Sequence, residues 1–360
     1  MIDAHITETV RLHAESMEKN GALCPEVLEL IHDRGLFKLF VPKEVGGRML
    51  GLPEALQVFE DAARADGSFG WLVQIGSGAG FFATVMEPGA VRQLFAHRNF
   101  YIAGSDRPMG TARKTPGGYK INGTWPFCSG ASHASLFTAT CRIASDDADD
   151  GKLQAFAFTP EQVEIDEDWN AFGLKATGSH IIHVADAFVP EHHRFDVADP
   201  HFHFDHPVYH YPFQPFATAN IASTAVGIAR HFFEASRTHI DRKQSSWMEK
   251  TPERYDQVNR LLAEHEAAFL RAREDFYNTV ESSWHSHLEG SPLEESHLDA
   301  VVGCSKIVAQ AGIGGAQAVL RHLGMDVIME DHPLNRIYRD LHVASQHGLL
   351  VDMTGEAADL

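Results

Sequence analysis

The chain has 360 residues, of which 44% are hydrophobic and 22% charged, values that are ordinary for a globular protein and exclude a disordered or fibrous chain. This length is too great for one ordinary hydrophobic core and indicates two or three packed domains. The formal net charge of -19 repels phosphate backbones and anionic lipid surfaces, and no cluster of lysines or arginines offsets it. We therefore expect neither nucleic acid nor a membrane as a partner.

Two further features favour a soluble, cytoplasmic protein. The first residues lack a basic segment followed by an apolar one, so we expect no signal peptide, and no apolar run reaches the ~20 residues of a membrane span. The cysteines are far apart and form no Cys-Xaa-Xaa-Cys pair, which favours reduced thiols over disulfides or zinc ligands. They are Cys24, Cys128, Cys141 and Cys304.

Residues 1–98 carry the apolar period of α-helices. The spacing predicts helices over residues 4–20, from Pro25 to Gly35, over 54–65 and, in a buried glycine-containing stretch, over 68–86. We expect this part of the chain to form an N-terminal helical domain.

The period changes near Asn99. Short segments rich in β-branched and aromatic residues then alternate with clusters of Gly, Pro or Asp, which is typical of a β-sandwich or barrel. The expected strands are residues 101–103, 119–121, 136–140, 153–158 and 180–184. We assign the β domain to residues 99–192.

Residues 193–360 begin with an irregular connector and then return to the helical period. Long helices are expected over 217–242, 255–280 and 298–323. Helices of this length with short connections pack as an antiparallel bundle. The chain is thus expected to be an α+β protein of three domains.

The segment from Asn122 to His133 places an aromatic, a hydroxyl and a glycine close together, as Phe127, Ser129 and Gly130. An aromatic can cover the face of a flat ligand, a hydroxyl can reach a heteroatom at its edge, and glycine lets the backbone come close. Taken alone, the same residues would also serve as core and cap.

Four segments together resemble the acyl-CoA dehydrogenase superfamily. Gly35–Gly47, Asn122–His133, Phe172–His180 and Asn335–His347 occur in that family's order, and the resemblance runs over nearly the whole chain. It implies a helical N-terminal domain, a central β-barrel or sandwich and a C-terminal four-helix bundle. It also implies a homotetramer.

The resemblance further implies a flavin held between the β domain and the bundle. Phe127 stands where the family has a tryptophan against the flavin, and Ser129 where it has a hydroxyl near flavin N5. The cofactor-binding residues expected on this basis are Trp125, Phe127, Cys128, Ser129, Gly130 and Arg339, with Trp125 and Cys128 as neighbours rather than direct contacts.

The chain departs from the dehydrogenases near its C-terminus. Many of them carry a glutamate just before a glycine, as the base that removes the α-proton, whereas here His347 precedes Gly348 and no acid lies between Asp340 and Asp352. His347, with Arg339-Asp340 and the segment Trp125–Gly130, resembles the two-component flavin-dependent monooxygenases. Members of that branch take reduced FMN or FAD from a separate reductase, bind O2 and hydroxylate aromatic or similar small substrates through a C4a-hydroperoxyflavin.

Two residues are expected to be catalytic on this reading. Ser129 would hold the proton on flavin N5 by accepting a hydrogen bond from it, and His347 would deprotonate or hold a phenol, since the unperturbed pKa of an imidazole is ~6.5. Members of the branch often carry another histidine in the helix equivalent to residues 71–82. This chain has none there, and Ser77 is a candidate to take its place.

Other functions stay open at this point. The chain could be an acyl-CoA dehydrogenase or oxidase with its base elsewhere, or a flavin-binding or interaction protein without catalysis. The connector also carries His201, His203 and His206, which could supply three nitrogen ligands. We expect no metal, because they lie in an aromatic stretch of a chain with 23 histidines.

Overall fold

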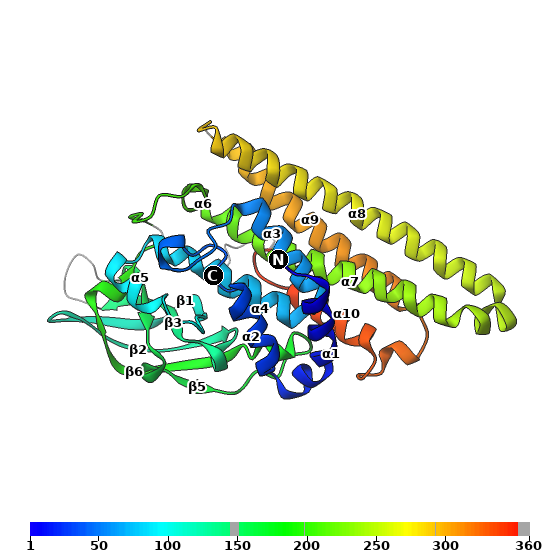
Figure 1. The fold of residues 1–360 in the computed structure, drawn as a ribbon, viewed down its shortest axis with the longest axis horizontal. Coiled ribbons are helices and arrows are strands. Elements are labelled where there is room, and N and C mark those ends of the chain that lie inside the picture. The colour runs from blue at the N-terminus through cyan, green and yellow to red at the C-terminus, as the bar shows by residue number, and fades with distance from the viewer. Residues whose placement is uncertain (145–150, 198, 292, 352–360) are drawn as a thin grey trace.

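The computed structural model describes residues 1–144, 151–197, 199–291 and 293–351. A β-sheet forms one end of the molecule, long helices run side by side at the other, and N-terminal helices lie between them (Figure 1). The predicted order of helical, β and helical parts is confirmed.

The N-terminal part is helical, as predicted. The helix predicted over 68–86 is shorter: α4 ends at Gly78, and a 3-10 turn, Ala79–Thr84, follows it. The closely spaced glycines of this stretch have a low propensity for the α-helix. The helices are α1 (Ala4–Asn20), α2 (Pro25–Arg34), α3 (Leu52–Ala65), α4 (Gly67–Gly78) and α5 (Pro88–Leu94), with a further 3-10 turn at Lys43–Val45.

The central part is one mixed sheet of seven strands in the order β5-β6-β2-β1-β3-β4-β7. Its strands are β1 (Ile102–Thr115), β2 (Gly118–Cys128), β3 (Leu136–Ala144), β4 (Leu153–Phe158), β5 (Glu164–Asp166), β6 (His180–Pro190) and β7 (Arg194–Phe195). Strand β1 pairs parallel with β3, and the register shifts between Ser105 and Gly110. All five predicted strands are present, and β5 and β7 are additional.

The C-terminal part contains the expected long helices. They are α6 (Pro207–His210), α7 (Phe213–Lys250), α8 (Pro252–Leu288), α9 (Glu295–Leu320) and α10 (Pro333–Ala344). No helix in the described ranges is both long and apolar enough to cross a membrane. Strand β7 pairs with β4 beyond residue 192, so strand pairing extends past the predicted limit of the β domain. The domain limits at 98 and 192 stay predictions.

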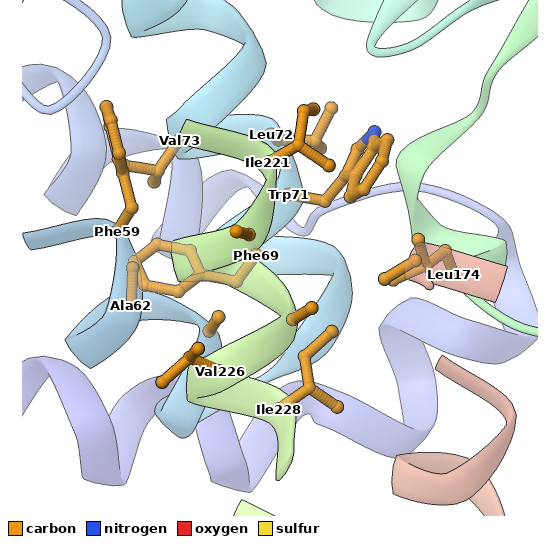
Figure 2. Packing of buried hydrophobic residues seen from close by; sticks show 14 of the residues in the cluster. Phe59, Ala62, Phe69, Trp71, Leu72, Val73, Leu174, Ile221, Val226 and Ile228 are labelled. Atoms are coloured by element: carbon orange, nitrogen blue, oxygen red, sulfur yellow. The ribbon is translucent and has the colours of Figure 1, made fainter. Parts of the chain in front are cut away.

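Helices α3, α4 and α7 form the centre of the core (Figure 2). Phe59 and Phe69 pack against the buried face of α7, which includes Val226. At Gly227 the two backbones come so close that a Cβ atom would lie 2.2 Å from the carbonyl oxygen of Glu60. Glycine is required there for α3 and α7 to pack.

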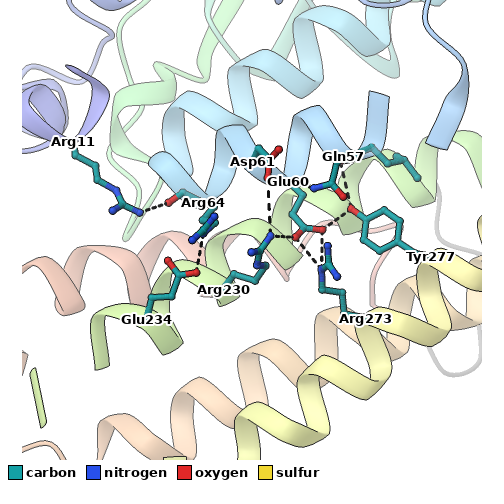
Figure 3. A network of polar contacts seen from close by, with 10 residues as sticks. Arg11, Gln57, Glu60, Asp61, Arg64, Arg230, Glu234, Arg273 and Tyr277 are labelled. Carbon is teal, nitrogen blue, oxygen red and sulfur yellow. Dashed lines mark hydrogen bonds and ion pairs between the residues drawn. The ribbon is translucent and has the colours of Figure 1, made fainter. Parts of the chain in front are cut away.

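Beside this contact, Glu60 is fully buried and joins three helices (Figure 3). Its carboxylate accepts hydrogen bonds from Arg230 of α7, from Nε of Arg273 on α8 at 2.9 and 3.0 Å, and from the hydroxyl of Tyr277 at 2.5 Å. The two guanidiniums compensate its charge. This network fastens the N-terminal helices to the C-terminal bundle.

A buried pair of acids lies where α4 and α10 meet. Asp66 caps α4 by accepting the Phe69 N–H at 3.1 Å, and Asp340 Oδ1 accepts the Leu174 N–H at 2.6 Å. Burial raises the pKa of both carboxyls, and the charge of Asp66 raises the pKa of Asp340 further. Folding therefore favours the state in which this pair of carboxyls holds a proton.

Replacing Glu60 with alanine is expected to destabilise the protein by about 3–5 kcal/mol, because the guanidiniums of Arg230 and Arg273 lose their common partner. Urea denaturation measures this loss. Glu234→Ala is the matched control, since it breaks a more exposed pair with Arg64 and should cost less than about 1 kcal/mol. Equal losses in the two variants would contradict the role given to Glu60.

The raised pKa of Asp340 predicts a pH dependence of stability. Its contribution is fully present below the unfolded pKa of 3.8 and declines as the pH rises towards the higher folded pKa. Asp340→Asn keeps an oxygen for the Leu174 N–H but carries no charge, so its melting temperature should fall less than the wild type's between about pH 4 and pH 8. Asp326→Asn is the control, because Lys243 lowers the pKa of that exposed carboxyl. An unchanged slope in Asp340→Asn would refute the prediction.

Candidate functional site

Phe127 projects outward from the end of β2. Its backbone has φ of +65°, unusual for a residue with a side chain, and the register with β6 shifts between Trp125 and Cys128. The ring is 55% exposed, with the guanidinium of Arg107 5.0 Å from its centre and Trp169 edge-on at 6.3 Å. The strained turn thus presents an aromatic face to solvent.

Trp125 and Cys128 are instead buried in the hydrophobic core. The Trp125 indole donates to the carbonyl of Thr140 at 3.0 Å and has no exposed surface. The Cys128 thiol is buried, and burial raises its pKa to about 12. Both are core residues, so any contact they make with a cofactor stays a prediction.

Ser129 lies between the sheet and helix α4, with 6% of its surface exposed. Its Oγ accepts the indole N–H of Trp71 at 3.1 Å and lies 2.8 Å from Oγ of Ser179. Its carbonyl accepts the Tyr101 hydroxyl at 2.9 Å. Hydrogen bonds therefore fix both its backbone and its side chain.

Gly130 has φ of +74°, and a Cβ atom there would lie 2.4 Å from Tyr101. Its N–H donates to the carbonyl of Thr177 at 2.7 Å. Tyr101 and the left-handed backbone thus suffice to require glycine, and the close approach of a cofactor at this position stays a prediction.

His347 follows α10 and packs against Trp71, with the ring centres 5.9 Å apart. Its Nδ1 accepts the Leu349 N–H at 3.3 Å, which places the hydrogen of the neutral imidazole on Nε2. Burial lowers its pKa, although the charge of Asp106 opposes this shift. Trp71 therefore touches both predicted catalytic residues, Ser129 and His347.

Arg339 is buried and bonded within the protein. Its guanidinium donates to Asn335 Oδ1 at 2.6 Å and to the carbonyl of Phe172 at 2.8 Å, and it forms an ion pair with Glu18 at 2.5 Å. These bonds join α10 to α1 and to the loop before β6. A guanidinium has five N–H donors, so these contacts do not use all of them, and a cofactor contact from Arg339 stays a prediction.

Ser77 is buried and bonded within the protein, so its role in place of the missing histidine stays a prediction. Its hydroxyl donates to the carbonyl of Leu36 and lies within reach of the Leu39 N–H, at 2.5 and 3.5 Å. Trp71, in the same helix, is the residue that reaches the candidate site. Sequence reasoning missed it, together with Ser179 and Thr177, although the last two lie in the Phe172–His180 motif.

The connector histidines and a cavity on the sheet lie elsewhere. His201 and His203 stand 4.8 Å apart edge-on, while Nδ1 of His206 caps α6. A cavity of about 390 Å³ on the sheet, lined in part by Lys114 and Arg194, includes none of the predicted site residues. In the described ranges, the groups close enough to share a metal ion are His13 with Cys24 and Glu26, and His239 with Asp326 and His332.

Comparisons with known proteins show relatives of similar length and fold. The indole-3-acetate monooxygenase of Pseudomonas putida is 29% identical over 356 residues, which cover 97% of this chain and 89% of that protein. The crystal structure of 3-HSA hydroxylase from Rhodococcus sp. RHA1 superposes with a TM-score of 0.87 at 21% identity, covering 96% of this chain and 91% of that one. XiaF from Streptomyces sp., solved in complex with FADH2 and glycerol, superposes with a TM-score of 0.82 at 19% identity, covering 96% of this chain and 91% of that one.

Two family models match the helical parts. The model described as "Acyl-CoA dehydrogenase, N-terminal domain" covers residues 1–93, and "Acyl-CoA dehydrogenase, C-terminal domain" covers residues 219–351. Together they span more than half of the sequence, on either side of the sheet that carries Ser129. The chain therefore belongs to the acyl-CoA dehydrogenase superfamily.

Proposed function

We propose that this protein is the oxygenase component of a two-component flavin-dependent monooxygenase. It would receive reduced FMN or FAD from a separate reductase and use O2 to hydroxylate an aromatic or similar small molecule. The observation that carries this proposal is the neutral imidazole of His347, at the place of the dehydrogenase base, packed on the indole that bonds Ser129. The similarity to monooxygenases over almost the whole chain supports it.

The residues around Ser129 fit a flavin ring. Phe127 offers an exposed aromatic face, and Ser129 offers a hydroxyl oxygen at the inner end of the same segment. Gln74, one turn beyond Trp71 on α4, has a buried side-chain oxygen without a hydrogen-bond partner in the described structure. Reduced flavin supplies the electrons with which O2 is activated, and the protein provides binding, orientation and exclusion of water.

His347 would act on the substrate. At neutral pH the lowered pKa keeps the imidazole uncharged, and the Leu349 contact leaves Nε2–H as the free donor. A donor suits an oxygen of a phenol or a carboxylate, which it would hold in place. Proton abstraction at Nε2 would require the ring to give up its bond from Leu349, so the geometry favours holding over deprotonation.

The alternative is an acyl-CoA dehydrogenase or oxidase with its base elsewhere. The acid of the same segment, Asp340, is buried and bonded to Leu174 N–H, and it is not presented to a substrate. A flavin-binding or interaction protein without catalysis would leave the contact between His347 and Trp71 without a role. The homotetramer and the cytoplasmic location stay predictions.

The first experiment is an anaerobic titration with reduced FMN and reduced FAD, followed by mixing with O2. We expect the protein to bind at least one reduced flavin and, with a reductase present, to hydroxylate an aromatic probe. Indole-3-acetate is the first probe, because the Pseudomonas putida relative is named for it. A protein that is purified with flavin and is reduced by acyl-CoA would support the alternative, and one that binds no flavin in either redox state would refute catalysis.

Substitution of His347 distinguishes holding from deprotonation. His347→Ala should lower coupled hydroxylation about 100-fold while reduced flavin still binds. His347→Gln should keep much of the activity, since its amide nitrogen can donate from near the position of Nε2 but cannot act as a base. Product formed per flavin oxidised is the measurement. If both variants are equally inactive, His347 acts as a base instead, and if both are fully active, it has no part in the reaction.

A further inference from the structure

Three hydroxyls form a buried row that leads away from Ser129. Ser129 Oγ lies 2.8 Å from Ser179 Oγ, which lies 2.7 Å from Thr177 Oγ1. Thr177 Oγ1 in turn lies 2.7 Å from the carbonyl oxygen of Leu174. All four residues are buried, so water does not compete for these bonds.

Counting hydrogens fixes the direction of the row. A carbonyl cannot donate, so Thr177 must donate to Leu174. Its only hydrogen is then used, and the 2.7 Å contact requires Ser179 to donate to Thr177. For the same reason Ser129 must donate to Ser179. Every hydroxyl hydrogen thus points from Ser129 towards the Leu174 carbonyl, and each bond in such a chain polarises the next.

Ser129 is therefore left with no free hydrogen. One lone pair of its Oγ receives the indole N–H of Trp71, and one remains. Towards any ligand, this hydroxyl can accept a hydrogen bond and cannot donate one.

A reduced flavin ring carries a hydrogen on N5, whereas N5 of the oxidised ring is only an acceptor. We propose that Thr177 and Ser179 are positioning residues that hold Ser129 as an acceptor, and that this makes the site select reduced over oxidised flavin. The inference rests on the proposed function, because it requires flavin N5 to lie beside Ser129. It assigns to the Thr177-Gly178-Ser179 motif the task of recognising the redox state of the cofactor.

The test compares dissociation constants of oxidised and reduced flavin, measured by anaerobic titration. In Ser179→Ala the Ser129 hydroxyl loses its acceptor and is free to turn its hydrogen towards oxidised N5. We expect the preference for reduced flavin to fall about tenfold, mainly through tighter binding of the oxidised form. Thr177→Val, which removes the end of the row, should act in the same direction and provides a second variant if the first does not fold.

Two controls separate this effect from a general loss of packing. Thr177→Ser keeps the hydroxyl and should restore the wild-type preference. Ser305→Ala removes another buried hydroxyl, on α9, whose bond to the Val301 carbonyl is unrelated to the site, and it should leave the preference unchanged. The reduction potential of the bound flavin gives an independent measure of the same ratio.

The outcomes are distinguishable. If Ser179→Ala and Thr177→Val fold and keep the wild-type preference, the role of the row is refuted while the proposed function stands. If the wild type binds both redox forms equally well, the inference is also wrong. If it binds neither form, the proposed function itself has failed.

Discussion

The structure depends on how firmly the loop before β6 is fastened to the C-terminal helices. Asp340 accepts the Leu174 N–H, and the neighbouring Arg339 donates to the Phe172 carbonyl. Both bonds come from one turn of α10; the bond to Asp340 is buried and the bond from Arg339 is partly buried. Because the row of hydroxyls ends on the Leu174 carbonyl, the position of Ser179, and with it that of Ser129, depends on a helix more than 150 residues further along the chain.

Local patterns in the sequence predicted the architecture well. The strands and the long helices follow from apolar residues that recur with periods of 2 and 3.6 residues. The family resemblance pointed to Ser129 and His347. Trp71 was missed because α4 is buried on nearly every side, so its apolar residues show no special face. Its hydrogen bond to Ser129 joins residues 58 positions apart, and no local pattern reports such a pair.

The internal contacts of Arg339 also could not be read from the sequence. The family resemblance of the C-terminal motif suggested a cofactor contact for this residue. In the folded chain, Arg339 donates to Asn335 and Phe172 and forms an ion pair with Glu18, and the last two residues come from other parts of the chain. Arg339 thus helps to hold the frame of the site, and its contact with a cofactor stays a prediction.

The burial of Cys128 has a consequence for chemical durability. An enzyme that activates O2 beside Ser129 works one residue away from a thiol, and oxidants attack thiolates far faster than thiols. Because burial raises the pKa of Cys128 to about 12, almost none of it is ionised at neutral pH. The Cys128 sulfur can therefore fill the core beside Ser129 and resist oxidation there.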